Sequence, residues 1–433
     1  MKRLLAFSIS LLMVLMMIPL SVSADNVTSQ TVVFLKDAGA DTNDGTSADK
    51  AVQTWDKAYD LLDLTKDCTI VVCGPTKLGA FRSGYYDNAN KVFILEPGTE
   101  YTGSVTITSV YDGVDYATTA GAKIVTEDGV TSFYGTTVID KISIEHTGKA
   151  FKIFVQCHEF TIGKDVKMTF TNAQLTGESF TSAVAILGGF QSNFNPEGHD
   201  HTRDTHINLL SGERYFVVAF NRVYNNTKYG NSHCDGSTTG TLFNPLIHTG
   251  DTYINIEGDT KVNTLVYANE RGNNVQAGDV VITVKDNAEI GSLCGQGTTG
   301  WTAVSVSSLT VNWQGGVIKS ADARGVVVTG DTVLNCAEGI DEAAIKTIKE
   351  NMNSPFYVDP EGDTNDDEDQ ETTSDKKDTT TDKKDTDTTK LEETTDEVKG
   401  GGCGSVVGGS ALIVAGAASL AGVAVTRKKK ENN

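Results

Sequence analysis

Between residues 69 and 336, short apolar segments alternate with clusters of Gly, Asn and Asp. Examples are TIVVCG, KVFILEPG, TYINIEGD and DVVITVKD, and in the last two apolar residues recur at every second position. A period of two puts apolar side chains on one side of a strand, whereas a helix requires a period near 3.6. The stretch lacks long amphipathic patterns of the helical kind. It therefore predicts short β-strands joined by tight turns.

An internal repeat organises these strands. Two apolar residues separated by one polar residue recur in segments that begin at Ile207, Ile254, Ile282 and Leu309. Another apolar residue lies eight positions after each start, at Tyr215, Val262, Ile290 and Val317. The last three starts are 28 and 27 residues apart, enough for one coil of a solenoid, and the first interval of 47 implies an insertion of roughly 20 residues. We expect Ile254, Ile282 and Leu309 to stack in neighbouring coils.

The polar residue inside each repeat points to the opposite face of its strand. These residues are Asn208, Asn255, Thr283 and Thr310. Because side chains alternate along a strand, stacked repeats bring these positions together on the outside. The sequence therefore predicts an exposed ladder of polar side chains.

This pattern resembles the right-handed parallel β-helix proteins of the pectate-lyase-like class. The resemblance implies an all-β solenoid over residues 69–336. An array of β-sandwiches is the alternative, since it also has strands separated by turns. A sandwich array does not require equivalent inward and outward positions every 27 or 28 residues, so we favour the β-helix.

Both ends of such a solenoid need a cover, because an open coil exposes unpaired strand edges and apolar core. Residues 25–68 are expected to form an N-terminal strand, a loop and a capping helix; the apolar residues at helical spacing are Val52, Trp55, Tyr59 and Leu62. Residues 337–360 are expected to form a C-terminal cap, whose helix has the apolar residues Ala344, Ile345, Ile348 and Met352. Asp341 and Glu342 suit the N-terminus of that second helix.

The two termini carry membrane-targeting patterns. Residues 1–24 combine Lys2 and Arg3 with an apolar stretch and small residues before Asp25, as in a cleaved signal peptide; a retained anchor is the alternative. Residues 406–426 carry no charge and form about 30 Å of helix, enough to span a membrane. The basic tail 427–433 should stay cytoplasmic. The alternative for this end is a sorting signal that is removed.

The residues before the predicted span narrow the cellular location. Gly402, Cys403, Gly404 and Ser405, followed by an apolar span and a basic tail, resemble the anchors of surface proteins of clostridia-like Gram-positive bacteria. The sequence has no LPxTG-type sortase signal. The resemblance implies a single-pass protein of the cell membrane with its folded part outside. Cys403, at the membrane boundary, is a candidate for lipidation or processing.

The distribution of charged residues distinguishes a linker from the folded region. The 433-residue chain has 57 acidic and 36 basic residues and a net charge of −21. Residues 361–399 contain 16 acidic and 6 basic residues, which is −10 of that total. A tract so poor in apolar residues predicts a disordered linker over 361–405, extended by like charges. The acidic balance and the lack of a basic patch exclude nucleic acid as a partner.

One acidic loop is a candidate calcium site. Asp41, Asn43 and Asp44 offer oxygen ligands of the kind that suit Ca²⁺, which is the cofactor we consider. An Asx turn that leads into the helix is the alternative. The strand, the loop ending in DGTS and the capping helix resemble the start of many bacterial surface β-helix proteins and polysaccharide lyases. That group contains enzymes and non-enzymes alike.

The densest cluster of chemically active side chains precedes the first repeat. It contains His199, His201, Arg203, Asp204 and His206, which we take as candidate ligand-binding residues. On an extended chain His199 and His201 share a face and can coordinate one transition metal ion together. Arg203 and Asp204 can instead contact an acidic or hydroxylated sugar. The alternative is a solvated loop without a ligand.

No residue set is singled out as catalytic. The carboxylate and basic motifs of polygalacturonases are absent, and nothing distinguishes one arginine as a base. We therefore expect a non-enzymatic adhesion or glycan-binding module, with a glycan or a host or cell-surface component as partner. A surface-tethered polysaccharide lyase or glycoside hydrolase is the alternative. A cleft in which Asp or Glu converges with Arg or Lys from neighbouring coils favours the enzyme, and a flat face favours binding.

Overall fold

The computed structural model describes residues 29–83, 86–87, 92–93, 101–172, 180, 183–189, 202–220, 246–270, 274–297, 304–352 and 357–358. The chain divides into two units, Met1–Asn365 and Asp366–Asn433, and every described residue lies in the first. The predicted signal peptide, linker, membrane span and basic tail lie outside the described residues. Within the described ranges, no helix combines the length and apolar character needed to cross a membrane.

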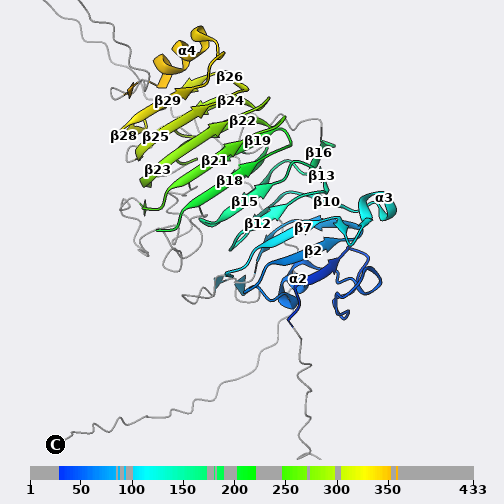
Figure 1. Cartoon of the computed structure of the whole chain (residues 1–433). Coiled ribbons are helices and arrows are strands. Elements are labelled where there is room, and N and C mark those ends of the chain that lie inside the picture. The colour runs from blue at the N-terminus through cyan, green and yellow to red at the C-terminus, as the bar shows by residue number, and fades with distance from the viewer. Residues whose placement is uncertain are drawn as a thin grey trace, which may run out of the picture. The chain divides into compact units, whose positions relative to one another are not determined.

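One long sheet runs through the whole folded unit, with every neighbouring pair of its strands parallel (Figure 1). In spatial order its strands are β1 (Val32–Leu35), β2 (Cys68–Val72), β7 (Val105–Thr108), β12 (Thr137–Ile139), β15 (Glu159–Ile162), β18 (Thr205–Leu209), β21 (Thr252–Ile256), β23 (Asn274–Val284), β25 (Ser305–Trp313), β29 (Thr332–Cys336) and β30 (Tyr357–Val358). β20 (Leu246–His248) pairs with β23, and β28 (Val327–Val328) pairs with β25.

Two further parallel sheets complete the body. The nine-stranded sheet contains β4 (Phe81–Arg82), β11 (Gly129–Ser132), β14 (Phe151–Phe154), β17 (Val184–Leu187), β19 (Tyr215–Val218), β22 (Lys261–Val266), β24 (Glu289–Cys294), β26 (Val317–Ile318) and β27 (Ala321–Asp322). The four-stranded sheet contains β3 (Pro75–Leu78), β10 (Lys123–Thr126), β13 (Ser143–His146) and β16 (Lys167–Phe170). We call one passage of the chain through these sheets a coil. The architecture is thus all-β with long parallel sheets, which is compatible with a β-helix.

Short antiparallel hairpins and helices decorate the coils. The hairpins are β5 (Tyr86–Asp87) with β6 (Val92–Phe93), and β8 (Val110–Tyr111) with β9 (Val114–Asp115). The helical segments are η1 (Ala48–Lys50), α2 (Trp55–Leu61), α3 (Tyr116–Ala120) and α4 (Glu342–Met352). The hairpin β8–β9 and α3 are inserted between β7 of the long sheet and β10 of the four-stranded sheet.

Columns of apolar side chains hold the coils together. Along the long sheet, one inward column runs through Val33, Ile70, Ile107, Ile139, Ile162, Leu209, Ile256, Val284 and Trp313, and each member is at most 2% exposed. Each member is the register partner of the next. The strand period of two therefore places the same side of every strand in one continuous core.

The predicted stacking is correct for Ile254 and Ile282, which are register partners. It is wrong for Leu309, which pairs with Val280, whereas Val311 is the partner of Ile282. The cause is a shorter corner: Ile290 follows Ile282 by eight residues, but its partner Ile318 follows Val311 by only seven. An alignment that keeps a spacing of eight therefore slips, and it also places the exposed Val317 where Ile318 belongs.

Within β25 the slip is two residues, so it leaves the inward and outward assignment of that strand unchanged, whereas the one-residue slip at Val317 reverses it. It does change the outward partner of Thr283, which is Asn312 rather than Thr310.

Helices lie at both ends of the long sheet (Figure 1). At the N-terminal end, α2 buries Trp55, Ala58, Tyr59 and Leu61, and the Trp55 indole N–H donates to the carbonyl of Lys77 at 2.8 Å. At the other end, α4 buries Ile348 and Met352. Asp341 accepts hydrogen bonds from the N–H groups of Ala343 and Ala344, which satisfies the first turn of α4.

We predict that an inward and an outward residue of the same strand differ sharply in their effect on stability. Ile282→Ala should lower the free energy of unfolding by about 2–5 kcal/mol, because it leaves a cavity in a fully buried column. Thr283→Ala, on the opposite face of β23, should cost about 1 kcal/mol or less. Denaturant unfolding of the two full-length variants measures the difference, and equal losses would contradict the inward column.

Candidate ligand-binding face

The two large sheets differ in what covers their outer faces. β17 and β19 of the nine-stranded sheet are buried on both sides. A second apolar cluster accounts for this, and it contains Phe154, Phe180, Ala183, Ala185, Leu187, Phe216, Val218, Val266 and Cys294. In contrast, β18 and β21 of the long sheet alternate between buried and half-buried residues. The outer face of the long sheet is therefore the more accessible of the two.

A line of polar side chains crosses this outer face. We call it the polar ladder; it consists of Thr161, Asn208, Asn255, Thr283, Asn312 and Asn335, each the register partner of the next and each half-buried. The Asn255 amide donates to Asn208 Oδ1 at 2.8 Å, and the Asn208 amide donates to Thr161 Oγ1 at 3.1 Å. Higher in the ladder, the Asn335 amide donates to Asn312 Oδ1 at 2.9 Å. These bonds fix the orientation of the amides.

Two rings stack directly beside the polar ladder. His206 and Tyr253 are register partners, and their ring centroids lie 4.8 Å apart with planes only 10° from parallel. The Tyr253 hydroxyl donates to Asp251 Oδ2 at 3.1 Å, which holds the ring in place. Burial, then that hydrogen bond and the charges of nearby aspartates, raise the pKa of Tyr253 above its ordinary value, so the phenol stays protonated.

A column of aspartates borders the same face. Asp204 directly precedes β18, Asp251 directly precedes β21, and Asp279 lies within β23. Three consecutive coils therefore contribute one aspartate each. Asp204 Oδ1 accepts from the Asp251 N–H at 2.9 Å, and Asp251 Oδ1 accepts from the Asp279 N–H at 2.8 Å. Each carboxylate thereby satisfies a backbone donor of the next coil while adding negative charge to the border of the face.

Three of the five candidate ligand-binding residues lie at this border. His206 belongs to the ring pair and Asp204 to the aspartate column. Arg203 turns toward the neighbouring coil, where its Nη1 lies 2.8 Å from Nε2 of the buried His158. His199 and His201 lie outside the described residues, so their coordination of a transition metal stays a prediction.

The residues predicted to bind calcium are engaged by their own loop. Asp41 accepts from the N–H groups of Gln53 and Thr54 and from the Thr54 hydroxyl, at 2.8–2.9 Å. Asp44 accepts from the Thr46 hydroxyl at 2.7 Å, and the Asn43 amide donates to the carbonyl of Ala51. These contacts close the loop onto α2 as Asx turns do. Within the described ranges, no three His, Cys, Asp or Glu side chains are grouped closely enough to hold a metal.

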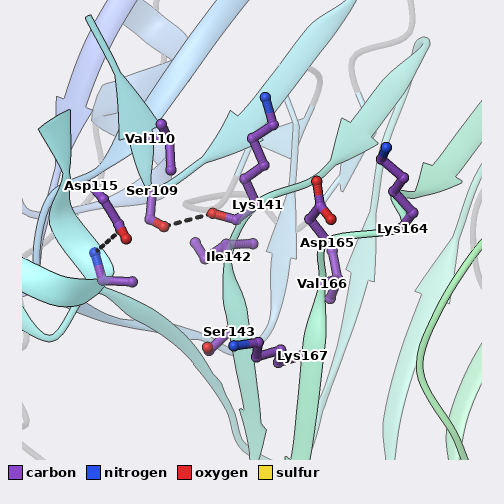
Figure 2. A pocket seen from close by; sticks show the side chains of 11 residues that line it. Ser109, Val110, Asp115, Lys141, Ile142, Ser143, Lys164, Asp165, Val166 and Lys167 are labelled. Carbon is purple, nitrogen blue, oxygen red and sulfur yellow. Dashed lines mark hydrogen bonds between the residues drawn. The ribbon is translucent and has the colours of Figure 1, made fainter. Parts of the chain in front are cut away.

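A second feature is a cavity of about 410 Å³ at the corner between the long sheet and the four-stranded sheet (Figure 2). Lys141, Lys164 and Lys167 line it, together with Asp115 and Asp165. The Asp115 carboxylate accepts from the Ala117 N–H and the Thr118 hydroxyl, and these bonds outweigh its slight desolvation and lower its pKa. Asp115 is thus an ionised helix cap.

Sequence reasoning found the polar ladder in part and missed its surroundings. The repeat pattern does not mark Tyr253 as a site residue, although its position one residue before Ile254 places it outward by parity. The aspartate column also left a signal, because Gly250–Asp251 and Gly278–Asp279 recur before equivalent apolar pairs. The lysines of the cavity left no clear local signal, since Lys141 comes from a different coil than Lys164 and Lys167.

Comparison with known proteins gives no relative: no family model, no curated protein and no solved structure matches this chain.

We predict that the loop carboxylates make the fold acid-sensitive. Hydrogen bonds from Thr46 and the charge of Lys50 lower the pKa of Asp44 from 3.8 to about 2. A carboxylate whose pKa is lower in the folded state stabilises the fold above about pH 4, and this contribution is lost as pH falls toward about 2. Asp44→Asn should therefore lower the melting temperature at pH 6, and the difference from the wild type should vanish near pH 2. A difference that is constant with pH would contradict this assignment.

Proposed function

We propose that this chain is a surface-displayed, right-handed β-helix of the pectate-lyase-like type that binds an extended glycan without cleaving it. The observation that carries the proposal is the polar ladder, which presents amides and hydroxyls in register along one accessible face. Six rungs at the spacing of neighbouring strands extend over about 24 Å. A flat ladder of this length suits a polymer of repeating units better than a small molecule.

The chemistry of the ladder suits sugar hydroxyls. A side-chain amide has two N–H donors and two acceptor lone pairs, and the contact with Asn208 uses only one donor of Asn255. The remaining groups can exchange hydrogen bonds with hydroxyls of a polysaccharide. His206 covers one face of the half-buried Tyr253 ring, and the rest of the ring, held by Asp251, offers an apolar contact for a sugar.

The negative charge around the polar ladder favours a neutral polymer over an anionic one. The aspartate column borders the ladder, and the whole chain carries a net charge of −21. A polymer rich in carboxylates or sulfates is repelled by that field. We therefore propose a neutral glycan of a host or microbial surface as the partner of the ladder.

The termini support display at a cell surface. A signal peptide at 1–24, an acidic tether at 361–405, a span at 406–426 and a basic tail at 427–433 would hold the folded unit outside the membrane. The length and charge of the tether favour an extended linker that keeps the ladder away from the bilayer.

An enzyme remains the alternative, and one observation favours it. The cavity at the sheet corner brings Asp165 and three lysines together from neighbouring coils (Figure 2). Carboxylates and bases in one cavity are the elements of lyase and hydrolase sites. Against a catalytic role, Asp115 is ionised and occupied as a helix cap, so it is a poor proton donor.

We predict that the full-length protein binds a neutral polysaccharide on a glycan array. The double variant Tyr253→Ala/Asn255→Ala should lower the affinity about tenfold, because it removes one ring contact and one rung. Thr169→Ala, an exposed change on β16 of the four-stranded sheet, is the matched control and should bind as the wild type does.

Reducing-sugar and unsaturated-product assays on the same polymer separate binding from cleavage. The proposal expects no product after prolonged incubation. Turnover that is lost on Asp165→Asn would replace it with the enzyme alternative.

We also predict that removal of residues 400–433 releases the protein from the cell. The full-length chain should sediment with membranes and resist extraction with salt, because the uncharged helix predicted over 406–426 is held in the bilayer by the hydrophobic effect. The truncated chain should appear in the medium. Release of the full-length chain by high salt alone would contradict the proposed span.

A further inference from the structure

The cavity at the sheet corner is built where the chain departs from its repeat. Three consecutive coils contribute Ser109–Val110, Lys141–Ser143 and Lys164–Lys167. The insertion formed by β8, β9 and α3 supplies the remaining wall through Asp115 and Ala117 (Figure 2). In solenoid proteins, insertions into single repeats commonly build the binding features. The cavity is therefore a place where the fold has been modified rather than merely repeated.

Several lysines elsewhere on the coils form ion pairs with glutamates of neighbouring strands or corners. Lys77 pairs with Glu127 at 2.9 Å, and Lys285 pairs with Glu257 at 3.0 Å, in each case across two strands or corners. Lys319 and Glu289 form another such pair. By comparison, the described residues provide no ion pair within 4 Å for Lys141, Lys164 or Lys167. These three exposed ammonium groups line one concave surface.

The cavity has a net positive charge on a strongly acidic protein. Three lysines face two aspartates, and the carboxylate of Asp115 is occupied by α3. Lys141 also has a φ of 52°, a left-handed conformation that favours glycine. The position therefore carries a lysine despite the backbone strain, which is a common feature of ligand sites.

The floor of the cavity is firm and partly apolar. Ile142 and Val166 are buried beneath it. The Ser109 hydroxyl donates to the carbonyl of Lys141 at 2.6 Å, which ties two coils together at the floor. Figure 2 places Lys141 and Lys164 on one side and Lys167 beside Ser143 on another. The lysines thus line the cavity from more than one wall.

We infer that this cavity binds a sugar that carries a tetrahedral oxyanion, a phosphate or a sulfate. Planar carboxylates are recognised best by the fork of an arginine, and the described residues that line the cavity include no arginine. Lysines act as separate point charges on flexible stems, and several of them can close on the oxygens of a phosphate or sulfate. This site is distinct from the polar ladder and does not depend on the function proposed for it.

Titration calorimetry of the full-length protein at low ionic strength tests the inference. The probes are glucose 6-phosphate, glucose 6-sulfate, glucuronate and glucose. The first two should bind, with affinity that falls as salt is added, whereas glucuronate and glucose should bind at least about tenfold more weakly. Equal affinity for glucuronate would overturn the preference for a tetrahedral group, and equal affinity for glucose would overturn the anion site.

Matched variants locate the site. Lys141→Gln/Lys164→Gln/Lys167→Gln should lower the affinity for glucose 6-phosphate about tenfold. The control Lys149→Gln/Lys261→Gln/Lys346→Gln changes three exposed lysines outside the cavity and alters the net charge equally, so it should bind as the wild type does. An equal loss in both triple variants would reduce the effect to the overall charge and overturn the site.

Two further variants separate this site from the ladder and from a general loss of folding. Asp165→Asn removes a negative charge from the cavity and should tighten binding of glucose 6-phosphate about two- to fivefold. Weaker binding of glucose 6-phosphate by Asp165→Asn would contradict the inferred electrostatics. Tyr253→Ala/Asn255→Ala should leave this binding unchanged, and a loss there would place the anion on the ladder instead.

Discussion

The structure depends on one constraint: each buried side chain of the long sheet must sit on its counterpart in the next coil while the backbones hydrogen-bond in parallel. Ile207, Ile254, Ile282 and Val311 satisfy both demands at once. A backbone shift of one residue would turn the whole apolar set outward, so only even shifts preserve the core. Differences in corner length are therefore absorbed outside the column, in turns and insertions, and the core remains continuous across coils of unequal length.

The same constraint organises the outer surface. Once Ile254 and Ile256 are fixed over their partners, Asn255 has no freedom to leave the line between Asn208 and Thr283. The polar ladder thus follows from the packing of the core. Its amides form a regular polar surface without any further structural requirement. The lysine cavity arises in the opposite way, from β8, β9 and α3, where the chain breaks the repeat. Regular and irregular parts of one fold accordingly produce two kinds of surface, a line of amides and a cavity lined by lysines.

The sequence was sufficient for the strands, their parity and the stacking of Ile254 on Ile282, because a period of two is a local property. It was insufficient for Leu309, since the corner between Trp313 and Ile318 is shorter by one residue and nothing local reveals which residue is missing. The candidate site followed the same division. Asn208 and Asn255 were visible within the repeat, whereas Lys141 and Lys164 line the same cavity only because Ile139 of one coil pairs with Ile162 of the next. Residues that come together from different coils have no fixed spacing within one segment, so a local sequence pattern cannot reveal them.

The 28-residue offset between Asn255 and Thr283 has an evolutionary consequence. Duplication of one such segment adds a rung while leaving both terminal lids, α2 and α4, in contact with their original neighbours. The reach of the surface can thus grow or shrink in whole steps by unequal recombination, without redesign of any existing contact. A lineage of such proteins would differ in the number of rungs before it differed in the chemistry of a single rung.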